Sequence, residues 1–246
     1  MTAVLVIAGA DSSGGAGLTR DVCTLTRLGV EAQCALTAVT AQTDAQLLGV
    51  HLIPADTVRA QIAAALAVPR ARAVKVGMLG TAASVRAVVD SLPPRAVLPL
   101  VVDPVLAASS GAALLDAPGR EALRELLLPR ATLLTPNIPE AAALLGARVA
   151  GSERELLEQG EALLARGAQA VLLKGGHAGG ALATDLLLRA GAAPQRWSAP
   201  RSAGARRGTG CTLSSAIAAG LAAGLELGAA CARAKRFVTE FIEHGG

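Results

Sequence analysis

Short, continuous apolar runs recur along the chain, and most are followed by a stretch of helical character. Runs that end at glycine or at a polar residue, such as 4–8 and 98–102, are typical of strands buried on both faces of a parallel sheet. The strands predicted in this way cover residues 4–8, 34–40, 73–79, 98–102, 131–135 and 170–174. The predicted helices cover residues 18–28, 54–66, 82–91, 118–128, 141–145, 153–166, 216–225 and 226–244.

This alternation of strands and helices predicts the fold class. At least five strand–helix units follow one another, which favours a parallel, doubly wound, three-layer α/β domain with right-handed crossovers. Residues 183–188 and 195–198 are predicted to add an antiparallel hairpin. No linker divides the chain, so we expect a single domain over residues 1–246. A polar, glycine-containing segment at 200–207 is expected to be mobile.

Composition narrows the class of protein. Hydrophobic residues make up 52% of the 246 residues, which excludes a disordered chain. The net charge is +4, and basic and acidic residues are interspersed along the chain. Aromatic residues make up only 1%, and both observations argue against a nucleic-acid-binding surface. The four cysteines lack metal-ligand or redox spacing, and the chain shows neither a signal peptide nor a membrane-spanning segment. We therefore expect a soluble, cytoplasmic protein without nucleic-acid or membrane partners.

A glycine-rich turn near the end of the chain is the strongest candidate for chemistry. Residues 206–215 carry two glycines and several small hydroxyl residues, directly before an alanine-rich helix. Gly208 and Gly210 allow the backbone to approach a ligand closely, and unpaired N–H groups at a helix start bind anions such as phosphate. Cys211 would lie at this helix start, where the pKa of a thiol can be lowered. The alternative is a turn that only starts a helix.

A second glycine-rich loop, 9–17, follows the first predicted strand. It lacks the Lys-Ser/Thr pair of a P-loop and the third glycine of a dinucleotide fingerprint, so it is not a standard nucleotide site. Asp11 and the glycine N–H groups suit a small polar ligand, and the alternative is an Asp-Ser turn that caps the next helix. Gln42 follows the second strand, where its amide could pair with the edge of a heterocycle.

Polar residues that suit phosphate and metal follow three later strands. Asp103 comes directly after one strand, and Lys174 ends another. Asn137 and Glu140 are three residues apart at a helix start, which is also the spacing of a capping box. Phosphoryl transfer requires a metal, a cation on the phosphates and N–H donors. Because all these residues fall on one predicted edge of the sheet, we interpret them as one phosphoryl-transfer site.

The motifs that carry these residues occur together in one known family. In chain order they are 7–17, 40–42, 75–79, 102–105, 135–141, 173–177 and 208–212. Together they resemble hydroxymethylpyrimidine/phosphomethylpyrimidine kinases of the ribokinase-like superfamily, over nearly the whole chain. The resemblance implies a three-layer ribokinase-like fold with a mostly parallel central sheet. It also implies ATP-dependent phosphorylation of 4-amino-5-hydroxymethyl-2-methylpyrimidine, and then of its monophosphate, in thiamine biosynthesis.

The resemblance further implies how the substrate is held. Gln42 would contact the polar edge of the pyrimidine. The residues expected to shape the rest of that pocket are Gly9, Asp11, Met78 and Val105. A homodimer is a further expectation from the resemblance.

At the reacting end, the resemblance assigns the phosphate, metal and proton chemistry. The anion hole for the transferring phosphoryl group would be formed by Gly208, Thr209 and Gly210. Cys211 stands where sugar kinases of the superfamily carry an aspartate base, so we expect its thiolate to accept the hydroxyl proton, with substrate positioning as the alternative. Mg²⁺ and the ATP phosphates would be served by Asp103, Asn137, Glu140 and Lys174, with Asp103 and Glu140 assigned to the metal.

Three positions depart from the common family pattern. Arg207 stands where a histidine is common, Thr43 where an asparagine is common, and Cys23 where a lysine is common. Arg207 and Thr43 border the expected pocket, so they bear on the second phosphorylation and on the exact substrate. We hypothesise that Arg207 contacts a substrate or nucleotide phosphate.

Three other functions compete with this one. A pyridoxal-type kinase of the same fold would share the anion hole, but Gln42 and Met78 favour the pyrimidine. A non-catalytic vitamin sensor would not require the complete set of phosphate-binding residues. A cysteine nucleophile at Cys211 would require a partner base, and the sequence places neither His177 nor His244 beside it.

Overall fold

The computed structural model describes residues 2–94, 96–108, 111–177, 181–201 and 206–244. Within them, one nine-stranded sheet has the order β3-β2-β1-β4-β5-β6-β7-β8-β9. Its strands are β1 (Ala3–Asp11), β2 (Glu31–Gln42), β3 (Leu47–Leu52), β4 (Ala71–Val76), β5 (Leu100–Val102), β6 (Leu133–Leu134), β7 (Ala170–Leu173), β8 (Leu182–Arg189) and β9 (Gln195–Pro200). The central strands from β2 to β7 pair in parallel, whereas β3, β8 and β9 pair antiparallel at the two edges. The predicted mostly parallel α/β fold is therefore confirmed.

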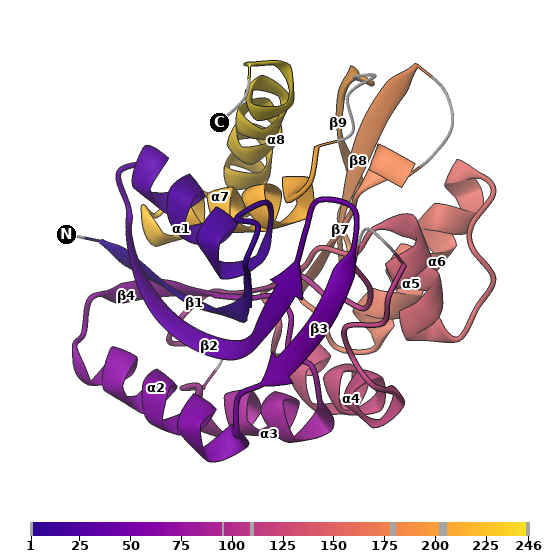
Figure 1. The fold of residues 1–246 in the computed structure, drawn as a ribbon. Helices are drawn as coiled ribbons and strands as arrows, with labels where there is room; N and C mark the ends of the chain where they lie inside the picture. The colour runs from indigo at the N-terminus through magenta and orange to yellow at the C-terminus, as the bar shows by residue number, and fades with distance from the viewer. Residues whose placement is uncertain (1, 95, 109–110, 178–180, 202–205, 245–246) are drawn as a thin grey trace.

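Helices cover both faces of the sheet (Figure 1). One face carries α1 (Gly17–Arg27), α7 (Thr209–Ala222) and α8 (Leu227–His244). The other face carries α2 (Ala55–Ala67), α3 (Ala82–Ser91), α4 (Ala117–Ala122), α5 (Ile138–Leu145) and α6 (Glu153–Ala165). Short helical turns lie at η1 (Leu123–Leu127), η2 (Leu128–Arg130) and η3 (Gly175–His177). Among the described residues, no helix combines the length and the apolar character that a membrane crossing requires.

Strand β1 explains why the central strands are continuous apolar runs. Leu5 and Ile7 pack into the core on the α2–α3 face, while Val4 and Val6 pack into the core on the α1–α7 face. Side chains alternate between the two faces of a strand, so a strand covered on both sides has no position left for a polar residue. The same burial holds for β7, and both strands were predicted from their sequence pattern.

The structure corrects the prediction at two elements. Strand β3 was not predicted, because it is an exposed edge strand without a clear apolar pattern. The helix predicted over 118–128 is α4 followed by a π-helical turn and a 3-10 turn, and Pro129 supplies no N–H to continue it. Helix α7 begins at Thr209, so the glycine turn forms the helix start at which Cys211 was expected. Of the predicted mobile segment 200–207, residues 202–205 lie outside the described residues.

The carboxyl ends of the parallel strands meet at one edge of the sheet. Ligands of open α/β sheets bind at this edge, because loops and helix starts converge there. The ends of β6 and β7 are joined beyond the strands by a bridge between Asn137 and Lys174. The fold therefore brings together residues that are far apart in the chain.

Candidate active site

A cavity of about 1010 Å³ opens at the carboxyl edge of the sheet. Every candidate site residue of the sequence analysis lines it: Gly9, Asp11, Gln42, Met78, Asp103, Val105, Asn137, Glu140, Lys174, Gly208, Thr209, Gly210 and Cys211. The walls come from the ends of β1, β2 and β4 on one side and from the starts of α5 and α7 on the other. The structure thus brings the predicted residues into one cavity, while the role of each remains a prediction.

The first turn of α7 has the geometry of an anion cradle. Gly208 is its N-cap residue with a φ of 76°, and a Cβ there would lie 2.3 Å from the carbonyl oxygen of Gly15. Only glycine tolerates both this conformation and this approach. A Cβ on Gly210 would lie 3.4 Å from Lys174 Nζ, so the backbone of the turn passes close to the charged cluster. The N–H groups of a first helical turn have no partner within the helix and are available to an anion.

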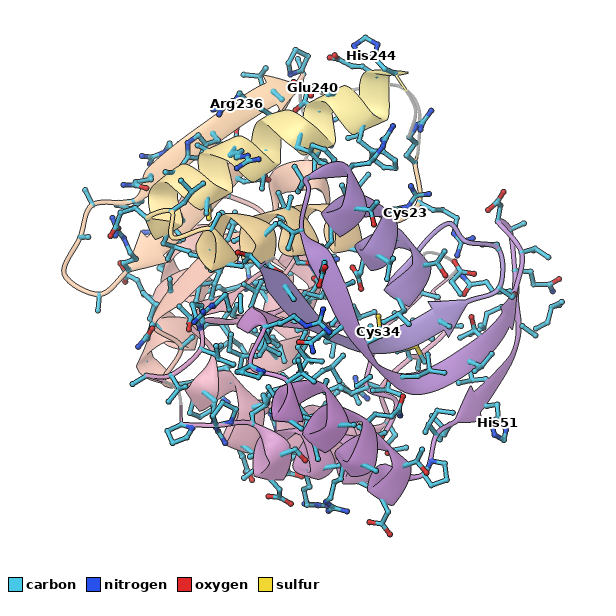
Figure 2. The ribbon with its side chains drawn as sticks, turned by 90° about the vertical axis from the view of Figure 1, so that its left-hand side faces the viewer. Cys23, Cys34, His51, Arg236, Glu240 and His244 are labelled. Carbon is cyan, nitrogen blue, oxygen red and sulfur yellow. The ribbon has the colours of Figure 1, made fainter. Side chains whose placement is uncertain are left out.

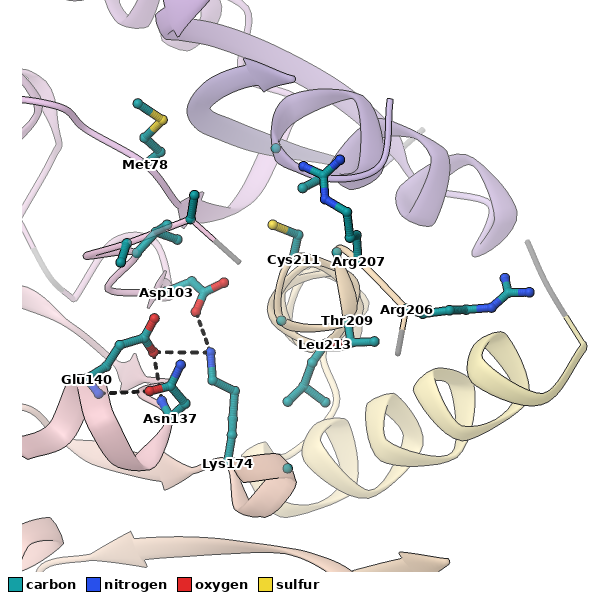
Figure 3. A pocket seen from close by; sticks show the side chains of 18 of the residues that line it. Met78, Asp103, Asn137, Glu140, Lys174, Arg206, Arg207, Thr209, Cys211 and Leu213 are labelled. Atoms are coloured by element: carbon teal, nitrogen blue, oxygen red, sulfur yellow. Dashed lines mark hydrogen bonds and ion pairs between the residues drawn. The ribbon is translucent and has the colours of Figure 1, made fainter. Parts of the chain in front are cut away.

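The charged cluster beside this turn is centred on Lys174 (Figure 3). Its Nζ donates to Asp103 Oδ1 at 2.8 Å and lies 3.6 Å from Glu140 Oε2. Asp103 also accepts from the hydroxyl groups of Thr135 and Ser214, each at 3.3 Å. The cluster therefore joins the ends of β5 and β7 to the starts of α5 and α7.

Asn137 and Glu140 form a complete capping box at the start of α5. The backbone N–H of Glu140 donates to Asn137 Oδ1 at 2.8 Å, and the N–H of Asn137 donates to Glu140 Oε2 at 2.7 Å. The structural alternative for this pair is thus present, and it orients Glu140 towards Lys174 at the same time. One residue pair both starts the helix and places a carboxylate in the cavity.

Burial and charge act against each other in this cluster. Burial alone would raise the pKa of Asp103, but the ammonium groups of Lys174 and Lys75 outweigh it and hold that pKa below its ordinary value. For Glu140, burial prevails over the attraction of Lys174 and raises the pKa. Burial opposes the charge of Lys174, but Asp103 and Glu140 raise its pKa above the ordinary value. Lys174 is therefore a permanent cation in the cavity.

The opposite end of the cavity is closed by the β1 and β2 ends. A Cβ on Gly9 would lie 2.8 Å from Met78 Sδ, so the glycine makes room for the methionine. The hydroxyl of Ser12 donates to the carbonyl of Gln42 at 3.0 Å and accepts from its N–H at 2.8 Å. Thr40 Oγ1 donates to Gln42 Oε1 at 3.3 Å. The Ser12 bonds fix the backbone of Gln42, and the Thr40 bond reaches its side-chain oxygen at the cavity wall.

Arg207 ties this end to the anion cradle. Its Nη2 donates to Asp11 Oδ2 at 2.8 Å, and its Nη1 donates to Ser13 Oγ at 2.8 Å and to Asp44 Oδ1 and Thr43 O at 3.1 Å. The other carboxylate oxygen of Asp11 accepts from the N–H and hydroxyl of Ser13. Asp11 therefore shapes the loop through protein contacts, and the departures from the family pattern at Arg207 and Thr43 contact each other.

Comparison with known proteins decides the family. The model of the phosphomethylpyrimidine kinase family matches residues 11–246. The chain belongs to this family. Named hydroxymethylpyrimidine/phosphomethylpyrimidine kinases include a Rhizobium meliloti protein, 43% identical over 97% of this chain and 90% of that protein. The Escherichia coli kinase of the same name is 44% identical over 87% of this chain and 81% of its own length.

Solved structures of related kinases share the fold of this kinase. A crystal structure of phosphomethylpyrimidine kinase from Clostridium difficile has a TM-score of 0.85 and 35% identity over 98% of this chain and all of that one. A pyridoxal kinase from Bacillus subtilis, in complex with ADP, has a TM-score of 0.90 and 32% identity over 99% of this chain and 92% of that one. The fold is therefore that of the ribokinase-like vitamin kinases.

The thiol of Cys211 differs from the expectation that its pKa is lowered. Burial raises the pKa of Cys211 to about 11. The charge of Lys75 and a hydrogen bond from the Gly17 backbone oppose this shift without overcoming it. In the resting site of this kinase, the thiol is therefore protonated at neutral pH.

Sequence reasoning missed four residues that line or support the kinase cavity. Lys75 lies within a family motif but received no role, and its partner Asp21 was not considered; their ion pair measures 2.7 Å with both side chains fully buried. Lys235 pairs with Asp185 at 2.9 Å at the other end of the cavity. A signal existed, because the chain has only three lysines, at 75, 174 and 235, and all three line this cavity.

The two histidine side chains that the structure describes give no support to a cysteine nucleophile in this kinase. Figure 2 shows His51 on β3 and His244 at the end of α8, on distant sides of the molecule. Neither residue lines the cavity that contains Cys211. In the described part of the chain, no group of three or more potential metal-binding side chains is present. The described histidine side chains therefore form no thiol–imidazole pair with Cys211. The described residues also form no metal site made of protein side chains alone.

Proposed function

We propose that this chain uses ATP to phosphorylate 4-amino-5-hydroxymethyl-2-methylpyrimidine, and then phosphorylates the monophosphate to the diphosphate, in thiamine biosynthesis. The observation that carries the proposal is the meeting, in one cavity, of the α7 cradle, Lys174 with its carboxylates, and the Gln42–Met78 end. This arrangement has an anion site between a permanent cation and a pocket for a small polar ring. Phosphoryl transfer is mainly positioning and charge stabilisation, which these parts supply.

The proposed reaction runs between the two ends of the cavity. Gln42 holds the pyrimidine, and Gly9, Met78 and Val105 confine it, so that the hydroxymethyl group points to the first turn of α7. The hydroxyl oxygen forms a bond to the γ-phosphorus of ATP, and the bond to the ADP oxygen breaks. The hydroxyl proton passes to Cys211 Sγ in the fraction of the enzyme whose thiol has already lost its own proton to solvent, so kcat should rise steeply towards alkaline pH. The backbone N–H groups of Thr209 and Gly210 donate to the transferring phosphoryl oxygens. Lys174 and Asn137 bind the ATP phosphates.

Magnesium fits this site as an ion that arrives with ATP. Asp103 Oδ2 accepts from Ser214, and both Asp103 and Glu140 already contact Lys174, so the protein offers two carboxylates rather than a complete cage. Mg²⁺ is commonly held by one or two carboxylates together with phosphate oxygens and water. When bound, the ion neutralises charge on the phosphates. Asp103 and Glu140 would hold it on the side of the cavity that faces α5.

A homodimer is part of the proposal. The outer strands β2 and β3 carry the exposed apolar side chains Val39, Leu48, Val50 and Leu52. An exposed edge strand with apolar side chains tends to pair with another chain. A second copy of this chain is the proposed occupant, and light scattering coupled to size-exclusion chromatography measures it. A monomer at micromolar concentration would contradict this part.

Pyridoxal is the second candidate substrate. The structural similarity to the B. subtilis pyridoxal kinase favours it, because that protein matches the fold as well as the phosphomethylpyrimidine kinase does. The two candidates differ at the ring, and Gln42 offers an amide to an aminopyrimidine edge. A substrate comparison separates them.

The test is ADP release with Mg-ATP and, in turn, hydroxymethylpyrimidine, its monophosphate and pyridoxal. Turnover of both pyrimidines supports the proposal, whereas turnover of pyridoxal alone would move the activity to the other vitamin. No turnover by a folded protein that still binds the pyrimidine would indicate a sensor. Cys211→Ala is the matched variant: it should lose most of the turnover, and Cys211→Ser should retain a hydroxyl for positioning but lose the steep rise of kcat towards alkaline pH.

A further inference from the structure

A fully buried lysine lies under the cavity and takes no part in the chemistry described so far. Lys75, on β4, is 0% exposed and lines the cavity. Its Nζ donates to Asp21 Oδ2 at 2.7 Å, and the Ser215 hydroxyl donates to Asp21 Oδ1 at 2.8 Å. One hydrogen-bonded chain thus joins β4, α1 and α7.

This chain of bonds ends on the face of α7 that carries Cys211. Ser215 and Cys211 are four residues apart on α7, so they share one face of the helix. Lys75 and Cys211 also line the same cavity, and each alters the ionisation of the other. A Cβ on Gly77 would lie 2.8 Å from Lys75 Nζ, so the glycine after β4 provides the room that the ammonium group occupies.

The other charges around Cys211 are already engaged. Lys174 pairs with Asp103 and Glu140, while Lys75 has Asp21 as its hydrogen-bond partner in the described part of the chain. Asp21 and Asp103 disfavour a thiolate at Cys211, whereas Lys75 and the Gly17 N–H favour it. An ammonium group has three N–H donors, so the bond to Asp21 leaves capacity to act on a neighbouring anion.

We propose that Lys75 is a positioning residue for phosphoryl transfer: its ammonium group, held by Asp21 and Ser215, stabilises the thiolate of Cys211. The inference rests on the proposed function, in which that thiolate accepts the hydroxyl proton. During the reaction the proton moves from the substrate hydroxyl to Cys211 Sγ, and Lys75 keeps its own proton. Burial opposes the charge on Lys75, but Asp21 outweighs it and raises its pKa above the ordinary value, which suits this fixed role.

The choice of lysine supports the inference. The chain has 23 basic residues, of which only three are lysines, at 75, 174 and 235. Lysine carries a compact point charge on a flexible stem, whereas arginine presents a broad planar fork. The narrow space beneath Gly77 suits the point charge.

The experiment measures the thiol directly, without ATP or pyrimidine. Rates of iodoacetamide alkylation at Cys211 are followed by peptide mass spectrometry between pH 7 and pH 11, with the exposed Cys23 as internal reference. A nearby charge commonly shifts a pKa by about one unit or more, so Lys75→Met should raise the pKa of Cys211 and slow its alkylation at pH 8 about tenfold. Asp21→Asn should shift the pKa downwards. Lys235→Met removes a lysine from another ion pair of the same cavity and should leave the pKa of Cys211 unchanged.

Opposite shifts of the Cys211 pKa in Lys75→Met and Asp21→Asn support the proposal. A general loosening of the fold would shift that pKa in the same direction in both variants. Unchanged thiol titration in a folded Lys75→Met protein would overturn it, as would parallel shifts in the two variants. If Lys75→Met does not fold, the direction of the Asp21→Asn shift decides. In an active wild type, kcat of Lys75→Met should fall about tenfold at fixed pH with the KM for ATP unchanged. An inactive wild type would contradict the proposed function and leave the thiol result standing.

Discussion

Arg207 Nη2 lies 2.8 Å from Asp11 Oδ2, and this ion pair joins the turn before α7 to the end of β1. The side chains are 14% and 5% exposed, so the pair is shielded from water. Because Nη1 also donates to Ser13 and to the 43–44 turn, one guanidinium group holds three segments around the cavity. The Gln42–Met78 end of the cavity is therefore closed by a residue that departs from the common family pattern.

Removal of this guanidinium group should loosen the substrate end. Arg207→Ala leaves Asp11 without its cation, and we expect a loss of about 1–3 kcal/mol in the free energy of unfolding. The KM for the pyrimidine monophosphate should rise about tenfold, since the loops no longer converge. Arg207→Lys keeps the charge but not the fork and should show a smaller effect. Unchanged KM values for ATP and the monophosphate in Arg207→Ala would refute the hypothesis that Arg207 serves a phosphate.

The anion cradle should depend on Gly208 both for its positive φ and for the absence of a Cβ next to the Gly15 carbonyl. Gly208 and Gly224 both have positive φ, 76° and 83°, at the two ends of α7. A Cβ at Gly208 would meet the Gly15 carbonyl at 2.3 Å, whereas nothing lies within 4 Å of a Cβ at Gly224. Gly224→Ala should cost about 1–2 kcal/mol and keep kcat, since only the left-handed backbone resists it. Gly208→Ala should cost more and lose most of kcat in the ADP-release assay; equal effects would contradict the cradle.

Substitution of Glu140 should separate its role in the helix cap from its proposed role as a metal ligand. Glutamine also serves in a capping box, so Glu140→Gln should change stability little while it removes the negative charge. The concentration of Mg²⁺ at half-maximal velocity should rise about fivefold or more, because one of two carboxylates is lost. Asn137→Ala should instead lose about 1 kcal/mol of stability through the cap. A Glu140→Gln enzyme with an unchanged Mg²⁺ dependence would argue against a metal ligand at this position.

The free energy of unfolding should fall at alkaline pH because of Cys231, a buried thiol that does not line the cavity. Burial raises the pKa of Cys231 to about 12, from an ordinary value of 9.0. Between these values the folded chain binds more protons than the unfolded chain, so the free energy of unfolding decreases as pH rises, by at most about 1.4 kcal/mol per pH unit. Urea unfolding between pH 8.5 and pH 10.5 measures the slope. Cys231→Ala should make the slope shallower but not remove it, because the raised pKa of Cys211 acts in the same pH range. An unaltered slope would assign the loss to other groups.

The sequence by itself determined the central layer and the residues at its edge. Strands β1, β5 and β7 are covered on both faces, so their apolar runs are continuous and their carboxyl ends can be read from the residue that follows, such as Asp103 or Lys174. Glycine turns and the Asn137–Glu140 spacing are local signals, because a cap or a positive φ is satisfied within a few residues. The exposed strand β3 carries no such signal and was missed.

Only the tertiary structure decided the electrostatics of the site. The pairing of Lys75 with Asp21 spans 54 positions in the chain, and that of Arg207 with Asp11 spans 196. The helix start alone predicts a lowered pKa for Cys211, but burial beneath the β1 loop raises it. Charge and desolvation depend on which atoms lie nearby in space, and neither spacing nor periodicity encodes that distance.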